Sequence, residues 1–252
     1  MKTYLLTGGA TGIGATIREA LVAAGNRVIT VDIKDGDYLV DLSDKKARQA
    51  VIKQIKADHS SLDGVITCAG VASHFPDRRK ILAINYAGTV ELIAGLRQTL
   101  GRGARVVAIS SNSAPMCASE ALVTALLDGN FEVADNIADT VSGHDCYSGS
   151  KQAVARWVRK MAPAYAREGI SMNAIAPGYI ETPMTQAVAQ NPEYGEAIKQ
   201  FVASIPAGRP GLPEDVARLV SFLLKPGSDF IAGSLIFVDG AHDAMLRPDV
   251  FG

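Results

Sequence analysis

The chain alternates short apolar runs with segments whose apolar residues recur at helical spacing. Residues 4–6 form a brief apolar run with strand character, and a glycine-rich turn follows them directly. Residues 15–24 place Ile17 and Leu21 on one face, which predicts an amphipathic helix. A second strand is predicted over residues 27–31. This order of strand, glycine turn, helix and strand is the local context in which a dinucleotide is bound.

The glycine turn, residues 7–14 with the sequence TGGATGIG, has the composition of a pyrophosphate cradle. Gly8 permits a tight turn, while Gly12 and Gly14 allow the backbone and a pyrophosphate to approach closely. The predicted helix that follows adds free N–H groups and the positive end of its dipole. Asp32 lies 18 residues beyond Gly14, at the end of the second strand, where a carboxylate accepts hydrogen bonds from the adenosine ribose.

Asp32 also predicts which nicotinamide cofactor binds. A carboxylate at this position repels the 2′-phosphate of NADP(H), and the neighbouring residues 29–33 contain no arginine that would neutralise it. Lys34 is near in sequence, but the alternation of side chains along an extended segment does not direct it at the ribose. We therefore expect NAD(H) as the cofactor.

A tyrosine and a lysine in the middle of the chain form the second candidate feature. Tyr147 and Lys151 are four residues apart, and helical spacing that continues to Met161 predicts that they share one face of a helix. A phenol, with an ordinary pKa near ~10, is a poor acid or base at neutral pH unless its anion is stabilised. The Lys151 ammonium and the positive charge of an oxidised nicotinamide would provide that stabilisation. We therefore interpret the pair as proton-transfer chemistry beside a nicotinamide, rather than as a surface pair.

Together with these two segments, further motifs along the whole chain resemble those of the short-chain dehydrogenase/reductase family. The matching segments are residues 62–70 (LDGVITCAG), 84–86 (INY), 106–111 (VVAISS), 175–178 (IAPG) with Thr182, 208–211 (GRPG), 213–217 (PEDVA) and 238–240 (VDG). The resemblance implies a single-domain α/β fold of the Rossmann type over residues 1–252. It would be a doubly wound parallel sheet of about seven strands, with the cofactor across the carboxyl ends of the strands.

The resemblance also implies a role for each catalytic residue. Tyr147 would exchange the proton of the alcohol or carbonyl oxygen, and Ser111 would donate a hydrogen bond to that oxygen. Lys151 would bind the nicotinamide ribose and lower the pKa of Tyr147. Asn85 would hold a water molecule that links Lys151 to solvent. The residues expected to contact the cofactor lie in the glycine turn or near the carboxyl ends of strands: Gly8, Thr11, Gly12, Ile13, Gly14, Asp32, Asp41, Leu42, Cys68, Ala69, Gly70, Tyr147, Lys151, Pro177, Ile180 and Thr182.

The cysteines include one departure from the usual family pattern. Thr67 and Cys68 replace two asparagines, and we interpret Cys68 as a small buried residue near the adenine side of the cofactor, not as a reactive thiol. Three cysteines, the other two being Cys117 and Cys146, do not predict a disulfide framework. A redox link between Cys117 and Cys146 is disfavoured in a reducing cytosol.

A second departure is the long stretch between Ser111 and Tyr147. Residues 114–145 carry two segments of helical spacing, which predicts a helical insertion. Because its two ends flank the candidate site, we expect it to border that site as a lid or binding loop. The insertion, with residues 41–43 and the tail at 240–248, most resembles the branch of bacterial 3α-hydroxysteroid dehydrogenases/carbonyl reductases.

Membership of that branch implies an apolar, cyclic secondary alcohol or ketone as the substrate. Residues 180–206 are expected to cover it as a lid. The apolar lid residues that suit such a ligand are Met184, Val188, Phe201, Val202 and Ile205. The same residues would equally serve to pack the lid against the body of the protein.

Two alternative functions remain open. Polar residues in the lid, Gln186, Gln190 and Asn191, are compatible with a dehydrogenase for a small polyol or sugar. A nucleotide-sensing protein without catalysis would keep the glycine turn and lose the chemistry. The chain retains all four predicted catalytic residues, so this second alternative is less favoured.

Composition and charge limit the partners. The chain has 252 residues, of which 48% are hydrophobic, enough for one well-buried domain. A formal net charge of −1, without a basic run, argues against nucleic acid or an anionic membrane as a principal partner. No apolar run reaches the ~18 residues of a spanning helix, so we expect a cytoplasmic protein that acts on a small molecule. The four histidines show no metal-ligand spacing with the cysteines, so no metal is expected.

Self-association is expected from the family resemblance. Its members usually pair through the helix that bears the tyrosine and lysine. The insertion leads directly into this helix and would block part of its surface. We therefore expect a homo-oligomer, with a dimer favoured over a tetramer.

Overall fold

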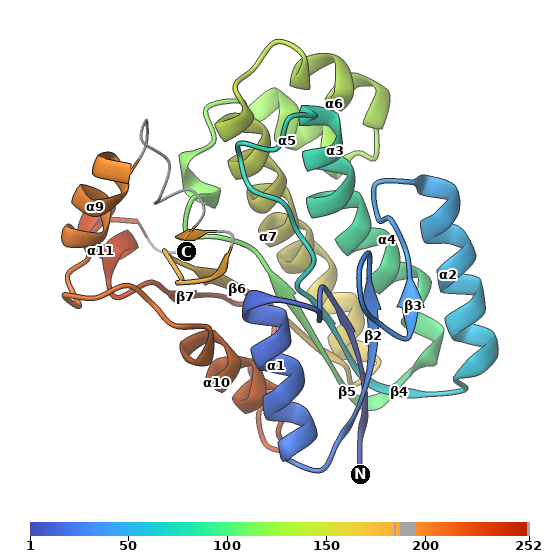
Figure 1. The fold of residues 1–252 in the computed structure, drawn as a ribbon. Coiled ribbons are helices and arrows are strands. Elements are labelled where there is room, and N and C mark those ends of the chain that lie inside the picture. The colour runs from blue at the N-terminus through green and yellow to red at the C-terminus, as the bar shows by residue number, and fades with distance from the viewer. Residues whose placement is uncertain (184, 187–194, 251–252) are drawn as a thin grey trace.

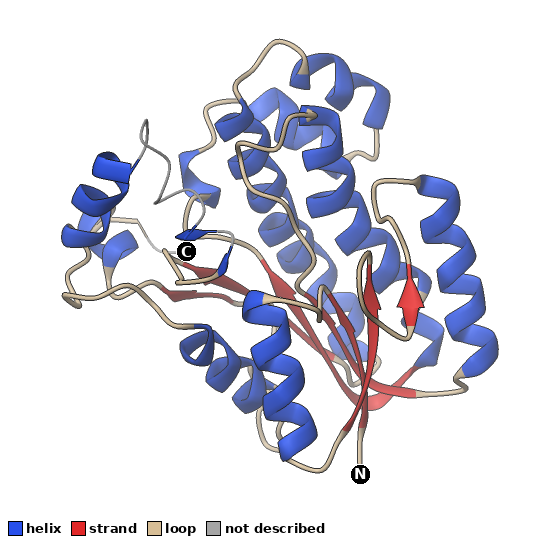
Figure 2. Ribbon diagram, in the orientation of Figure 1, coloured by secondary structure: helices blue, strands red, loops and turns tan. Residues whose placement is uncertain are grey.

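A seven-stranded parallel sheet forms the centre of the molecule, in the order β3-β2-β1-β4-β5-β6-β7 (Figures 1 and 2). The computed structural model describes residues 1–183, 185–186 and 195–250. The strands are β1 (Thr3–Thr7), β2 (Arg27–Asp32), β3 (Tyr38–Leu39), β4 (Leu62–Thr67), β5 (Leu100–Ile109), β6 (Ser171–Pro177) and β7 (Leu235–Val238). The predicted doubly wound sheet of about seven strands is confirmed.

The direction in which the chain adds strands reverses between β3 and β4. β1 pairs with β2 on one side and with β4 on the other, so Thr7 lies beside both Val31 and Thr67. In an open parallel sheet, such a reversal leaves a crevice outside the carboxyl ends of the central strands, and ligands bind there. Topology alone therefore places a binding site at the end of β1.

Helices cover both faces of the sheet because alternate strand residues point in opposite directions. Leu6 belongs to a buried cluster with Ile17 of α1 and Val220 of α10. Its neighbour Leu5 belongs to a second cluster, which includes Ile55 of α2 and buried residues of α4 and α7. Figure 1 shows these two helical layers on either side of the sheet. The helices are α1 (Gly12–Ala23), α2 (Lys45–Asp58), α4 (Gly88–Gly95), α7 (Gly143–Arg167) and α10 (Pro213–Leu223), with a 3-10 turn η2 (Arg97–Thr99) before β5.

The insertion folds as a pair of short helices on α7. A 3-10 turn η3 (Ala114–Met116) leads into α5 (Glu120–Leu127) and α6 (Phe131–Ala138). Ser119 and Asn130 cap the two helices by accepting hydrogen bonds from backbone N–H groups of the first turn. Leu122 of α5 is buried against Gly149 of α7, where a methyl group on the glycine would lie 3.1 Å from the leucine side chain. The helices of the insertion are therefore part of the packed body.

The described helix of the predicted lid packs against the C-terminal region. Helix α9 (Gly195–Ala203) lies beside α11 (His242–Leu246) (Figure 1). The ring of Phe201 in α9 lies 4.7 Å from that of His242 in α11 and 6.3 Å from that of Tyr179. Aromatic rings at these separations attach the lid helix to the body. Among the helices that the structure describes, none has both the length and the apolar stretch that crossing a membrane requires.

Candidate active site

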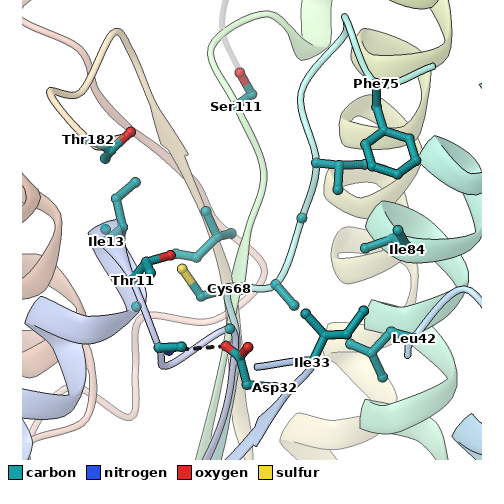
Figure 3. Close-up of a pocket in the computed structure, with 18 of the residues that line it drawn as sticks. Thr11, Ile13, Asp32, Ile33, Leu42, Cys68, Phe75, Ile84, Ser111 and Thr182 are labelled. Carbon is teal, nitrogen blue, oxygen red and sulfur yellow. Dashed lines mark hydrogen bonds between the residues drawn. The ribbon is translucent and has the colours of Figure 1, made fainter. Parts of the chain in front are cut away.

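A cleft of about 530 Å³ opens at the carboxyl ends of β1, β4 and β5. The glycine turn after β1 forms one wall, and the segment that follows β4 forms the other (Figure 3). Ser111, Tyr147 and Lys151 lie in this cleft, as does Asp32. The two motifs that are far apart in the sequence therefore meet in one space.

The glycine turn is shaped by contacts that no side chain would permit. The N–H of Gly8 donates to the carbonyl of Val31 at 2.9 Å, and Gly8 has a left-handed φ of +74°. A methyl group on Gly14 would lie 1.8 Å from the carbonyl oxygen of Gly8. Thr11, the N-cap residue of α1, makes no side-chain hydrogen bond to the first turn of that helix. The first-turn N–H groups are therefore left for an anionic ligand in the cleft.

Asp32 is fixed by two backbone hydrogen bonds. Its Oδ2 accepts from the N–H of Ala10 at 3.0 Å, and its Oδ1 accepts from the N–H of Lys34 at 3.0 Å. These bonds aim the carboxylate at the cleft and leave lone pairs for ribose hydroxyls. Beyond Asp32, the side chains of Ile33, Leu42 and Ile84 gather at the same end of the cleft (Figure 3). An apolar slot next to a carboxylate has the character of a site for a planar base such as adenine.

Ser111 follows β5, and Tyr147 lies near the start of α7. Ser142 caps this helix by accepting from the N–H of Asp145 at 3.0 Å. The hydroxyl of Ser113 donates to the Oγ of Ser111 at 3.0 Å, and this contact orients the Ser111 hydroxyl. Burial raises the pKa of Tyr147, and the Ser111 hydroxyl acts in the opposite direction.

Lys151 lies under the tyrosine, one turn further along α7. Its Nζ donates to the carbonyl of Ile109 at 3.1 Å and lies 5.9 Å from the centroid of the Tyr147 ring. Burial lowers the pKa of Lys151 to about 8, so the side chain is still mainly an ammonium at neutral pH. We expected Lys151 to lower the pKa of Tyr147. The upward shift in the pKa of Tyr147 comes from burial, and Ser111 is the group that opposes it; the effect of Lys151 on this pKa stays a prediction.

Asn85 occupies a π-helical turn, η1 (Ala83–Ala87), between α3 (Arg78–Leu82) and α4. Its side chain is fully buried: Oδ1 accepts from the N–H of Val71 at 2.8 Å, and Nδ2 donates to the carbonyl of Val71 at 3.0 Å. Nδ2 also lies 3.3 Å from the Oγ of Ser150. A methyl group on Gly70 would lie 3.1 Å from Oδ1 and 3.4 Å from the Nζ of Lys151. Asn85 is therefore next to Lys151, but behind the surface of the cleft.

All other residues that the sequence assigned to catalysis or cofactor binding line the cleft. They are Gly8, Thr11, Gly12, Ile13, Gly14, Asp32, Asp41, Leu42, Cys68, Ala69, Gly70, Ser111, Tyr147, Lys151, Pro177, Ile180 and Thr182. The structure adds Val71, Phe75, Lys80 and Thr185, which the sequence did not single out. Val71 directly follows the Ala69-Gly70 turn, and this adjacency is the one signal that would have found it.

The insertion and the apolar lid residues are placed differently from the expectation. Within the described chain, no residue of the range 114–145 lines the cleft, because α5 and α6 pack on a different side of α7. Phe201, Val202, Ile205 and Gln186 do not line it either. Phe201 instead packs on His242 and Tyr179, as the alternative interpretation of the lid anticipated. The remaining lid candidates, Met184, Val188, Gln190 and Asn191, lie outside the described residues.

The cysteines are present as free thiols. Burial raises the pKa of Cys68 to about 12, so this thiol stays protonated at neutral pH although its side chain faces the cleft (Figure 3). Cys117 Sγ lies 3.7 Å from the carbonyl of Asp145, whereas Cys146 Sγ lies 3.9 Å from that of Ala138. In the ranges for which the structure gives positions, no group of His, Cys, Asp and Glu side chains is arranged to hold a metal ion.

Comparison with known proteins agrees with this geometry. The sequence profile described as "short chain dehydrogenase" matches residues 37–122, and that described as "Enoyl-(Acyl carrier protein) reductase" matches residues 134–241. The 3-alpha-hydroxysteroid dehydrogenase/carbonyl reductase of Comamonas testosteroni is 36% identical, with 100% of each chain aligned. The chain belongs to the short-chain dehydrogenase/reductase family. It is thus assigned to a family of oxidoreductases.

Other relatives within the short-chain dehydrogenase/reductase family extend the likeness. The crystal structure of the 3-alpha-hydroxysteroid dehydrogenase from Pseudomonas sp. B-0831, complexed with NADH, superposes with a TM-score of 0.93 at 36% identity. The aligned region covers 99% of this chain and 100% of that one. The cis-4-hydroxycyclohexanecarboxylate dehydrogenase of Sinomonas cyclohexanicum is 29% identical over 97% of both chains.

Proposed function

We propose that the protein is an NAD(H)-dependent oxidoreductase that interconverts a secondary alcohol and a ketone. The observation that carries the proposal is the convergence of Ser111, Tyr147 and Lys151 on the same cleft that contains the glycine turn and Asp32. The cofactor fits this cleft for two reasons. The N–H groups at the start of α1 have no side-chain cap, and Gly8 and Gly14 pack closely without a side chain that would stand in the way of a pyrophosphate. The NADH complex of the Pseudomonas relative supports the same assignment.

In the proposed reaction, bound NAD(H) supplies or accepts the hydride. Tyr147 gives its phenolic proton to the carbonyl oxygen during reduction and removes it during oxidation. Ser111 donates a hydrogen bond to the same oxygen and stabilises the charge that develops there. Lys151 holds the nicotinamide ribose, and its positive charge favours the tyrosinate. Asn85 supports the positions of these residues by fixing the backbone of Val71, which lines the cleft.

Asp32 selects NAD(H) over NADP(H) in this proposal. Its two oxygens are held in place by Ala10 and Lys34, so the carboxylate does not swing aside without losing both bonds. A 2′-phosphate would meet this negative charge at close range. The remaining contacts are assigned to the residues of the cleft named above, with Asp41 and Leu42 on the adenine and Pro177, Ile180 and Thr182 on the nicotinamide.

The substrate that we favour is an apolar, cyclic secondary alcohol or ketone of the hydroxysteroid type. Two relatives named for 3-alpha-hydroxysteroid oxidation and one named for a hydroxycyclohexane support this class. Val71 and Phe75 give the cleft an apolar wall. A polyol or sugar is the alternative substrate class: of the three polar lid residues that suit it, Gln186 does not line the cleft, and Gln190 and Asn191 lie outside the described residues. A protein that only senses nucleotides is less favoured, because binding a nucleotide does not require Ser111, Tyr147 and Lys151 to be assembled in the cleft.

A spectrophotometric assay at the NADH band tests the proposal. With NAD⁺, the protein is expected to oxidise a 3α-hydroxysteroid such as androsterone faster than the members of a panel of small polyols. NADH is expected to be turned over faster than NADPH at equal concentration when a ketone is supplied. Activity on another alcohol but not on the steroid would support the proposed reaction and contradict the proposed substrate class. A faster rate with NADPH would reject the role of Asp32, and no reaction with any alcohol would reject the enzyme.

We also propose that the protein is a homodimer of the cytoplasm. The insertion covers part of α7, the helix through which family members usually pair, since Leu122 packs directly on Gly149. This leaves less surface for a tetramer. The three free thiols suit a reducing compartment. Sedimentation velocity at micromolar concentration is expected to show a dimer, and a monomer would contradict the proposal.

A further inference from the structure

A buried arginine lies directly behind the adenine end of the cleft. Arg48, in the first turn of α2, is only 4% exposed. Its Nε donates to one carboxylate oxygen of Glu91 at 2.9 Å, and its Nη2 donates to the other at 3.2 Å. Glu91 lies in the first turn of α4, so this bidentate pair joins α2 to α4.

The same guanidinium holds the wall of the cleft. Its Nη1 donates to the carbonyl oxygens of Leu42 at 2.7 Å and Ser43 at 3.2 Å, and both residues line the cleft. Leu42 also rests on the start of α4, where a methyl group on Gly88 would lie 3.3 Å from the leucine Cβ. One side chain therefore sets the position of the backbone that carries Leu42.

The pair is also linked to Ile84, a second side chain of the slot. Ile84 lines the cleft from the π-helical turn η1, which continues without interruption into α4 and Glu91. Leu42 and Ile84 are grouped at this end of the cleft (Figure 3). Arg48 is bonded to the segment that bears Leu42 and, through Glu91, to the helix that bears Ile84. One ion pair is thus linked to both segments that carry these two side chains.

Stability alone does not account for a buried ion pair at this place. Removing two charges from water is costly, and apolar residues of similar volume often replace such a pair without loss of stability. What apolar residues would not supply are the two hydrogen bonds to the carbonyls of Leu42 and Ser43. Arginine provides a rigid, planar set of donors that meets a carboxylate and two carbonyls at once.

We propose that Arg48, held by Glu91, is a positioning residue for the adenosine half of the cofactor. This inference rests on the proposed function, because it assumes that the slot at Leu42 and Ile84 holds adenine. Arg48 holds the backbone that carries Leu42 to the helix that follows Ile84, and it does not itself line the cleft. Its loss is expected to weaken adenosine binding and to leave the chemistry at Tyr147 unchanged.

The test uses ligands that carry one half of the cofactor each. ADP-ribose contains the adenosine and both phosphates, and reduced nicotinamide mononucleotide contains the reacting ring without the adenylate. In R48M, and in R48M/E91L, where neither charge is left unpaired, calorimetry is expected to show a Kd for ADP-ribose raised about tenfold or more. The kcat/KM with reduced nicotinamide mononucleotide, and kcat at saturating NADH, should stay within about twofold of the parent protein.

A matched control is R97M, because Arg97 also pairs with both oxygens of a carboxylate, that of Glu168, but does not line the cleft. R97M is expected to bind ADP-ribose like the parent. An unchanged Kd in R48M/E91L would overturn the proposal, as would an equal loss with both half-ligands, which would indicate general damage to the fold. A parent protein that binds neither ADP-ribose nor NADH would instead reject the proposed function itself.

Discussion

Tyr147→Phe is expected to lower kcat by about 10²- to 10⁴-fold, the contribution of a positioned general acid or base. The substitution removes the phenolic oxygen and keeps the ring, so the packing of α7 is preserved. Ser111 and Lys151 remain in place, but in the proposed mechanism neither of them exchanges a proton directly with the substrate oxygen. The Kd for NADH, measured by fluorescence titration, should stay within about twofold of the parent value.

The matched control is Tyr165→Phe. Tyr165 lies on the same helix and is fully buried, and its hydroxyl lies 3.5 Å from the carbonyl of Ile93, away from the cleft. This variant should retain the parent kcat. Activity of Tyr147→Phe comparable with that of the parent would show that another group transfers the proton. A parallel loss of NADH binding would show that Tyr147 acts through the shape of the cleft instead.

Gly14→Ala is expected to abolish measurable NADH binding and to lower the midpoint of thermal unfolding. The added methyl group would lie 1.8 Å from the Gly8 carbonyl oxygen, so the backbone must separate at this point. Gly8 has little freedom to move, since its N–H is bonded to Val31 and its Cα lies so close to the backbone of Ala69 that an added methyl group would be 2.7 Å from it. Overpacking of this kind typically costs about 1–3 kcal/mol of stability.

Gly101→Ala provides the comparison for this substitution. A methyl group on Gly101 meets no atom within 4 Å, and the residue does not have a left-handed φ. This variant should unfold at the parent temperature and bind NADH normally. Calorimetric or fluorescence melting curves, together with an NADH titration, distinguish the two variants. Parent-like affinity in Gly14→Ala would mean that the glycine turn does not form the pyrophosphate site.

Tyr147 is buried, and burial raises the pKa of its phenol, whereas the Ser111 hydroxyl lowers it. In the proposed mechanism, the positive charges of Lys151 and of an oxidised nicotinamide would both favour the tyrosinate. Proton transfer by Tyr147 would then be coupled to binding of the cofactor.

The local features of this protein were predictable from its sequence. The strand, glycine turn and helix at residues 4–24 follow from spacing over a few residues, because steric limits on the backbone act between near neighbours. The position of Asp32 was predictable for the same reason. The residue ends a strand that lies next to the glycine turn, so its side chain is at the cleft. Tyr147 and Lys151 share a helix face by geometry alone.

The tertiary structure decided which surfaces meet. The spacing of apolar residues in the range 114–145 predicts two helices with buried faces, but the pattern does not say what buries them, and they pack on α7 instead of bordering the cleft. The fold shows the Asn85 amide bonded to Val71, a residue brought to it by β4, and the water relay expected of Asn85 stays a prediction. Arg48 gives no signal in the sequence, because its partners Leu42 and Glu91 come together only when α2 and α4 pack on the same face of the sheet. Periodicity in the sequence indicates that a side chain is buried. Which residues it packs against depends on the order of strands in the sheet, and that order is determined by contacts between residues far apart in the chain.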